Sequence, residues 1–124
     1  MRRCLVVAWC LPLLACAGVG QESLLITEED EIAMGAQYHQ QLLAQMPEYQ
    51  GDPRIGEYIR GMGAEIALQS DRPNLQHTFT VVGSEEINAF AVPGGFVYVT
   101  MGLLRSATSG AEVASVIAHE LGHI

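Results

Sequence analysis

The chain has 124 residues, 49% of them hydrophobic, and it carries 14 acidic residues against six arginines and no lysine. This length accommodates one small domain, and the apolar fraction is typical of a chain that folds around a core. The formal net charge of -8 excludes the basic surface of a nucleic-acid-binding protein, so we expect no nucleic-acid partner.

The N-terminal segment MRRCLVVAWCLPLLACAGVG has a basic start, an apolar run and small residues after it. This order is typical of an export signal, and the run, interrupted by Pro12, is shorter than the roughly 20 residues of a spanning helix. The stretch LLAC ending at Cys16 resembles the lipobox of bacterial lipoproteins. It predicts a signal over 1–16 and a lipid anchor on Cys16. Ordinary cleavage after Ala17 is the alternative, because Ala15-Cys16-Ala17 also fits the small-x-small rule.

A mature chain that starts at Cys16 has Ala17, not Asp, in second place. By resemblance to lipoprotein sorting rules, this predicts a periplasmic protein anchored in the outer membrane of a diderm cell. No thiol remains after position 16, so the domain has neither a disulfide framework nor a cysteine nucleophile.

Two helices are expected after a linker over 17–26. Thr27 can cap the first helix with Asp30 three residues on, and Pro47 marks its end. The second begins at Asp52 with Pro53 in its first turn. The apolar positions recur at helical spacing in both: Ile32, Ala36, Leu42, Leu43 and Met46 in the first, and Ile55, Ile59, Met62 and Ile66 in the second. Glycines at 56, 61 and 63 suggest that another element packs closely against the second helix.

A change to β-rich composition follows the turn at 72–74. HTFTVVG predicts a strand, and INAFAV and FVYVT around Pro93-Gly94-Gly95 predict a hairpin. His77 is interpreted as a polar residue at a strand edge, and His39 as a surface or boundary residue of the first helix.

The last predicted helix carries the chemistry. Ser109 and Glu112 form a capping box, and Val113, Val116, Ile117 and Leu121 form the buried set. The motif HELGH places His119 and His123 about 40° apart on one face, where two imidazoles can bind one Zn²⁺. Glu120 projects beside them, in the place of the base that takes the proton of a zinc-bound water.

The run INAFAVPGGFVYVTMGLL followed by AEVASVIAHELGH resembles the zinc metallopeptidase family that includes HtpX, BepA and the CAAX prenyl proteases. The resemblance extends more faintly over the first two helices. It implies that Asn88, Ala89 and Phe90 belong to an edge strand that binds extended peptide substrate through its backbone. It also implies a third zinc ligand, a glutamate on a later helix. The sequence shows no stop signal for the last helix, so we expect residues 27–124 to be the N-terminal part of the peptidase domain.

The expected fold is therefore α+β and zincin-like, with N-terminal helices, a small antiparallel sheet with a hairpin, and then the HExxH helix. The expected function is zinc-dependent hydrolysis of unfolded or misassembled envelope proteins, outer-membrane proteins among them, with one Zn²⁺ per chain. Two alternatives remain open. HELGH also begins the metzincin pattern, whose third ligand is a histidine. The domain could also be a chaperone-like or scaffolding lipoprotein that hydrolyses nothing.

Overall fold

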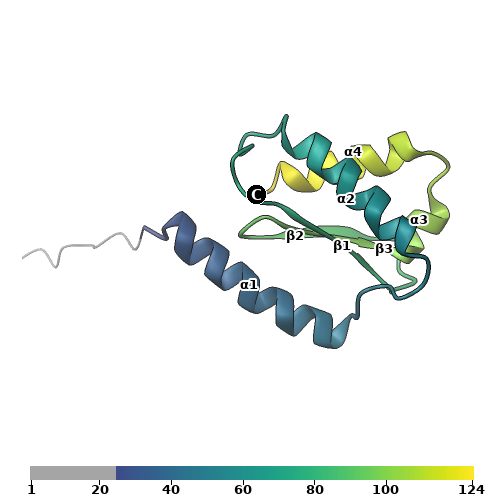
Figure 1. Ribbon diagram of the computed structural model, residues 1–124, viewed down its shortest axis with the longest axis horizontal. Coiled ribbons are helices and arrows are strands. Elements are labelled where there is room, and N and C mark those ends of the chain that lie inside the picture. Colours follow the sequence, from purple (N-terminus) through teal and green to yellow (C-terminus); the bar gives the residue numbers. More distant parts are fainter. Residues whose placement is uncertain (1–24) are drawn as a thin grey trace, which may run out of the picture.

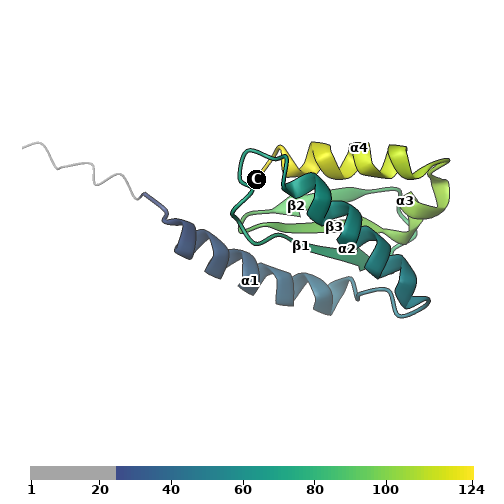
Figure 2. The same ribbon diagram turned by 45° about the horizontal axis from the view of Figure 1, so that its top comes forward.

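The computed structural model describes residues 25–124, so the predicted signal over 1–16 and Cys16 lie outside the described residues. The elements follow one another as α1 (Glu28–Gln45), α2 (Pro53–Ala67), β1 (Thr78–Val82), β2 (Ala89–Val92), β3 (Phe96–Thr100), α3 (Met101–Ser106) and α4 (Gly110–Leu121). Figures 1 and 2 show three layers: α1 covers one face of the sheet, and α2 and α4 cover the other. The predicted α+β class is confirmed.

The sheet has the order β1-β3-β2 and is mixed, not purely antiparallel as the sequence analysis expected. The predicted hairpin is correct, since β2 and β3 pair antiparallel with Ala89 opposite Val99. However, β1 pairs parallel to β3, with Thr78 opposite Phe96. The segment 83–88 carries the chain past the position of β3 to the far edge, and the hairpin then returns β3 to the middle. Strand composition carries no information about this direction.

Capping residues begin the three longer helices where the sequence indicated. The hydroxyl of Thr27 accepts a hydrogen bond from the Asp30 N–H (3.1 Å), and the Asp30 carboxylate accepts one from the Thr27 N–H (3.3 Å). Asp52 caps α2 through the Arg54 N–H (3.0 Å). Ser109 caps α4. The predicted capping box of α4 requires the Glu112 carboxylate to accept a hydrogen bond from the N–H of Ser109. It accepts one instead from the Thr108 N–H (2.9 Å), one residue before the cap.

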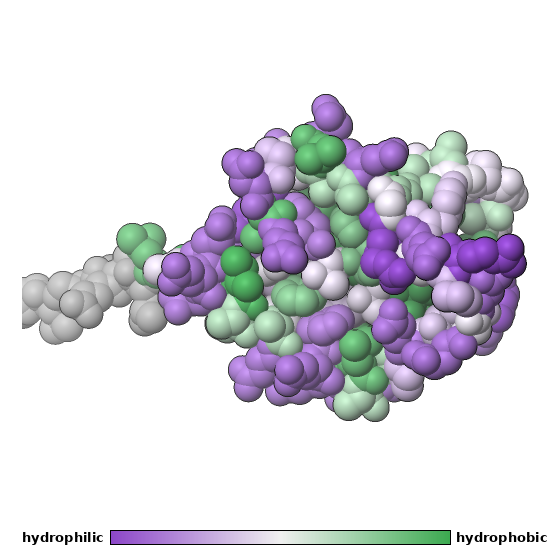
Figure 3. Space-filling model, viewed as in Figure 1, coloured by the Kyte–Doolittle hydropathy of each residue, from purple (hydrophilic) through white to green (hydrophobic). Residues whose placement is uncertain are grey.

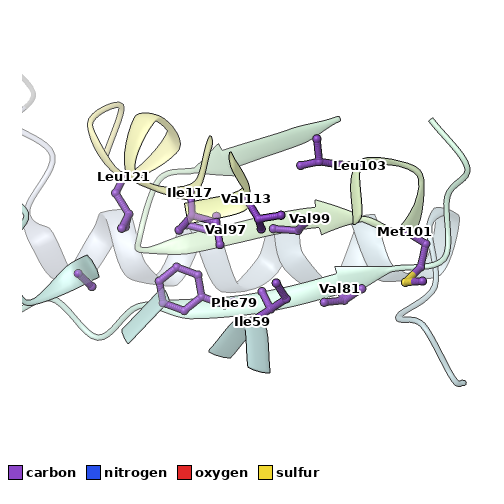
Figure 4. Close-up of a cluster of buried hydrophobic side chains, with 11 residues drawn as sticks. Ile59, Phe79, Val81, Val97, Val99, Met101, Leu103, Val113, Ile117 and Leu121 are labelled. Atoms are coloured by element: carbon purple, nitrogen blue, oxygen red, sulfur yellow. The ribbon is translucent and has the colours of Figure 1, made fainter. Parts of the chain in front are cut away.

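The main core lies between the sheet and the pair α2 and α4 (Figure 4). Val97 and Val99 of the central strand are fully buried there, in one cluster with Ile59 and Ile117. Val113 and Leu121 of α4 are buried as predicted, and Val116 is only half-buried. The apolar stripe of α2 is confirmed, since Ile55, Met62 and Ile66 pack around this core.

The opposite face of the sheet packs against α1, and Ala36, Leu42, Leu43 and Met46 of the expected face are half-buried. Gly35 is the only buried residue of α1. His39 is half-buried, stacks on Phe96 and is hydrogen-bonded through Nδ1 to the hydroxyl of Tyr98 (2.7 Å). Ile32, expected in the buried face, is 38% exposed. Gly35 and His39 therefore add to the expected apolar contacts of this helix, and an apolar periodicity cannot reveal these two.

The short helix α3 was not expected from the sequence. Thr100, the last residue of β3, caps it by accepting a hydrogen bond from the Leu103 N–H (3.2 Å). No helix among residues 25–124 is both long and apolar enough to cross a membrane.

Candidate metal centre

The two histidines of the HELGH motif converge on one point at the C-terminal end of α4. Helix α4 buries Val113, Ile117 and Leu121 against the core, which leaves His119 and His123 exposed. Their Nε2 atoms lie 3.1 Å apart and their rings are nearly perpendicular, at 86°. Two nitrogens of a tetrahedral zinc shell lie roughly 3.3 Å apart when each is about 2.0–2.1 Å from the ion. The pair therefore fits two ligands of one Zn²⁺.

The last turn of the motif departs slightly from the regular helix that was expected. Helix α4 ends at Leu121, and the His123 N–H donates to the carbonyl of Glu120 (3.1 Å), three residues back. Gly122 keeps a right-handed backbone, with φ -68° and ψ -11°. Because the turn continues in the helical sense, His123 still returns to the face of His119.

Glu120 lies between the two histidines in the chain and is half-buried. None of the ion pairs among residues 25–124 includes it. No arginine in this part of the chain is therefore paired with its carboxylate. A carboxylate that accepts a proton from a water has to be accessible in this way.

The third ligand is not supplied by the described residues. Within residues 25–124, no group of three His, Cys, Asp or Glu side chains is placed to hold a metal ion. His39 is occupied by Tyr98 on the other side of the sheet. His77 is half-buried beside Phe79, and burial lowers its pKa. The donors present therefore account for two positions of a zinc shell, His119 and His123.

Strand β2 is an edge of the sheet, and the register shows which of its backbone groups face outward. The Thr100 N–H donates to the carbonyl of Asn88 (3.1 Å), so residues 88, 90 and 92 face β3. The bond from the Thr78 N–H to the Gly95 carbonyl (2.8 Å) agrees, since it places the odd-numbered residues of β3 toward β1. The N–H and C=O groups of Ala89 and Ala91 therefore point to the open edge.

The three residues expected to bind substrate have different surroundings. Asn88 is exposed, and its N–H donates to the hydroxyl of Thr100 (3.1 Å). Phe90 stacks on Tyr98 on the α1 face, with ring centroids 4.9 Å apart. The side chain of Ala89 lies against the core on the α4 face. Ala91 has the same orientation as Ala89 but was not singled out in the sequence, because only the hairpin register distinguishes it.

A polar network beside His123 was also missed. Arg72 donates to Glu31 (2.9 Å), to Glu28 (3.0 Å) and to the carbonyl of Ile124 (3.0 Å). Glu31 also accepts from the Gly94 N–H (2.9 Å), and these two donors, Arg72 first, lower the pKa of Glu31. The network joins the start of α1, the hairpin turn and the residue after His123. These partners are far apart in sequence, so no local pattern signals them.

An HExxH pair on a capped helix, next to the open edge of a small sheet, is the arrangement of a zinc-dependent peptidase site. Residues 53–124 match the model of Peptidase family M48, and the chain belongs to this family of metalloproteases. The match favours the resemblance noted in the sequence over the metzincin pattern.

The relatives are proteases. The chain is 34% identical over 99 residues to the putative beta-barrel assembly-enhancing protease of Vibrio cholerae, a match that covers 80% of the chain and 20% of that protein. It is 33% identical over 94 residues to the beta-barrel assembly-enhancing protease of Escherichia coli K12, covering 76% of the chain and 19% of the relative. A 43-residue segment is 51% identical to the mitochondrial metalloendopeptidase OMA1 of Arabidopsis thaliana, covering 35% of the chain and 9% of the relative. The chain thus spans about a fifth of the length of the two bacterial relatives.

Proposed function

We propose that the chain forms the metal-binding and substrate-pairing part of an exported zinc metalloendopeptidase that hydrolyses unfolded or misassembled envelope proteins. The observation that carries the proposal is the convergence of the His119 and His123 Nε2 atoms, 3.1 Å apart, on the helix that packs beside the edge strand β2. The bacterial relatives are named beta-barrel assembly-enhancing proteases, which supports proteins of β-barrel assembly as substrates, and we propose outer-membrane proteins among them.

His119 and His123 would hold the ion through Nε2. A bound Zn²⁺ supplies Lewis acidity toward the scissile carbonyl and the attacking water. Glu120 follows His119 on the same turn, and its carboxylate would accept the proton of that water. The protonated Glu120 would then deliver a proton to the leaving amine, as a general acid.

The peptide would be held in an extended form by the edge of β2. The outward N–H and C=O groups of Ala89 and Ala91 offer the ladder that an added strand requires. The methyl side chains of Ala89 and Ala91 pack toward the core on the α4 face, so no bulky side chain of β2 separates this edge from the helix that carries the histidines. Asn88 and Phe90 would contribute by fixing the strand, through Thr100 and Tyr98 respectively.

The proposed location in the cell is inferred from the N-terminal segment, which lies outside the described residues. We propose that Cys16 is lipidated and anchors the protein to the outer membrane. The domains that follow from this proposal are the signal over 1–16, the linker over 17–26 and the peptidase part over 27–124.

The test compares Glu120→Gln with His119→Ala in the whole gene product. His119→Ala, and equally His123→Ala, should lose zinc and activity together. Glu120→Gln should keep zinc and the fold, while hydrolysis of casein falls by roughly 100-fold or more because the base is gone. Glu65→Gln, an exposed residue of α2, is the matched control and should change neither.

Zinc content by atomic absorption and casein cleavage are the two measurements. Near-normal turnover by Glu120→Gln would refute the role of this carboxylate. A whole gene product that binds unfolded protein and zinc but cleaves nothing would favour the chaperone-like alternative.

A further inference from the structure

An apolar groove lies between α1 and the end of β2, on the face of the sheet opposite α4. Its volume is about 260 Å³, and it is lined by Met34, Gly35, Tyr38, Val92 and Pro93. Met34 and Tyr38 are 50% and 52% exposed, although both are large and apolar in most of their surface. Figure 3 shows hydrophobic residues among hydrophilic ones over the region that α1 occupies in Figure 1. These two exposed side chains flank a hollow beside the edge that is proposed to bind peptide, and this makes the groove a candidate binding surface.

A neighbouring hollow borders the metal motif. A second hollow of about 310 Å³ is lined by Met34 and Pro93 together with Glu31 and His123. Met34 and Pro93 therefore form part of both walls. The groove and the hollow at His123 are therefore neighbours on either side of these two residues.

The alternation of side chains along a strand determines which side chains of a bound peptide would reach the groove. Phe90 and Val92 point to the α1 face, whereas Ala89 and Ala91 point to the α4 face. A peptide added to the open edge of β2 follows the same pleat, so every second side chain lies on the α1 face. The side chain that pairs near Val92 then lies over Met34 and Tyr38.

The charge around the groove selects an uncharged occupant. Among the side chains that line the two hollows, only those of Glu31 and His123 are acidic or basic; Tyr38 contributes a phenol, which is neutral at pH 7. The Glu31 carboxylate is already bound to Arg72 and to the Gly94 N–H. A cationic or anionic side chain would find no partner there and would lose hydration, while Leu, Phe or Met would gain by burial against apolar walls.

We propose that Met34, Tyr38, Val92 and Pro93 form a specificity subsite that takes a large apolar side chain of the peptide paired with β2. This inference rests on the proposed function, because it uses the same peptide and the same edge. It adds the substrate class: extended segments with bulky apolar side chains at alternate positions. Met34 and Tyr38 are then specificity-determining residues contributed by a helix that carries no part of the metal motif.

The experiment measures binding, so that it does not depend on cleavage. The whole gene product with Glu120→Gln is titrated, in the presence of zinc, with two fluorescent peptides that form extended strands and differ only in one central residue, Phe or Asn. We expect the Phe peptide to bind about tenfold more tightly, the discrimination typical of an apolar pocket. Adding Met34→Gln should reduce this preference to about twofold and leave the affinity for the Asn peptide unchanged. Leu68→Gln, which alters a 65% exposed residue directly after α2, is the control and should retain the full preference.

A second readout locates the contact. With methionine methyl groups labelled for NMR, the Phe peptide should shift the resonance of Met34 and leave that of the buried Met101 unchanged. Equal binding of both peptides, a preference that survives Met34→Gln, or an unmoved Met34 methyl would each overturn the subsite. Loss of self-association in Met34→Gln without any Phe preference would overturn it in favour of a contact between two copies.

The subsite and the proposed function can fail separately. If the Phe peptide binds through Met34 but the whole gene product hydrolyses neither casein nor the peptide, the proposed subsite is supported and the proposed peptidase function is wrong. If casein is cleaved and Met34→Gln changes neither binding nor the choice of cleavage position, the peptidase stands and the groove is wrong.

Discussion

Gly61 and Gly63 lie two residues apart in α2, yet they have different surroundings. A Cβ atom added at Gly63 would lie 2.5 Å from the ring of Phe79, in the core between α2 and the sheet. A Cβ atom added at Gly61 would meet nothing within 4 Å. The sequence suggested close packing as a reason for the glycines of this helix, and the structure supports that reason for Gly63 alone.

Alanine substitutions at these two positions should therefore have opposite effects. Gly61→Ala should raise the free energy of unfolding by about 0.5–1 kcal/mol, since alanine loses less backbone freedom in a helix. Gly63→Ala should lower it by about 1–3 kcal/mol, because Phe79 or the helix has to move. Urea unfolding followed by circular dichroism measures both changes. Destabilisation of equal size by the two substitutions would contradict the packing described for Phe79.

The relative placement of the three motif residues is the part of the candidate site that follows from the sequence. His119 and Glu120 lie in the last turn of α4, and His123 lies in the turn that continues it in the helical sense, so their spacing largely determines how they lie relative to one another. Arg72 could not be identified in this way. Its partners Glu28, Glu31 and Ile124 are brought to it only by the tertiary fold.

At the scale of elements, strand β2 has two different backbone edges. Residues 88, 90 and 92 face β3, and Ala89 and Ala91 face outward. Proline is tolerated in a strand only where the missing N–H points away from the sheet. The two edges can therefore be tested by the same substitution at neighbouring positions.

Ala91→Pro should keep the fold and weaken binding of an extended peptide by about tenfold or more, since one outward donor is removed from the ladder. Phe90→Pro should instead unfold the hairpin, because it removes a hydrogen bond to β3 and the stacking on Tyr98. Circular dichroism and peptide titration of the Glu120→Gln protein separate the two outcomes. An Ala91→Pro protein that is folded and binds peptide normally would show that substrate does not pair with this edge.

The positions of helices and strands were predicted correctly where residues close in sequence determine them. The caps at Thr27, Asp52 and Ser109 and the Pro93-Gly94-Gly95 turn place the three longer helices and the hairpin. Both turn glycines have positive φ, 89° and 88°, which explains the choice of residue. Helix α3 was missed because six residues directly after a strand are too few to show a period. The parallel pairing of β1 was missed because strand direction depends on the path of the whole chain.

At the scale of the whole molecule, Arg72 and Glu31 connect three segments, and this makes stability depend on pH. The pKa of Glu31 in the folded protein is below its usual value of 4.5, since Arg72 and Gly94 stabilise the carboxylate. The contribution of Glu31 is therefore fully present above about pH 4.5 and is lost as the pH falls through the lower pKa of the folded state.

Glu31→Gln should lower stability at pH 7 and flatten the loss of stability between about pH 5 and pH 3, because the neutral amide does not titrate. Urea unfolding at several pH values measures this slope. Glu65→Gln, which removes an exposed carboxylate outside the network, should leave the slope unchanged. An unchanged slope in Glu31→Gln would show that this network does not contribute to acid sensitivity.

Placement of the protein in the cell depends on the segment before α1. If Cys16 is the lipidated residue, Cys16→Ser should abolish incorporation of labelled palmitate and move the protein from the membrane fraction to the soluble fraction. Cys10→Ser, which changes a thiol inside the proposed signal, is the matched control and should do neither. Absence of palmitate from the unsubstituted protein would leave ordinary cleavage after Ala17 as the explanation of the segment.

The contact between α1 and the hairpin turn has a consequence for how the protein responds to what it binds. A Cβ atom at Gly35 would overlap the carbonyl of Pro93, and Glu31 bonds the Gly94 N–H, so the turn and the helix hold each other in place. A peptide in the groove would contact both Pro93 and Met34 and would bind only when α1 is docked. By linkage, a peptide bound in the groove should slow amide hydrogen exchange throughout α1. Any change that loosens α1 should in turn weaken peptide binding by the same free energy. Helix α1 would thus act as a sensor of occupancy, on the face of the sheet opposite α4.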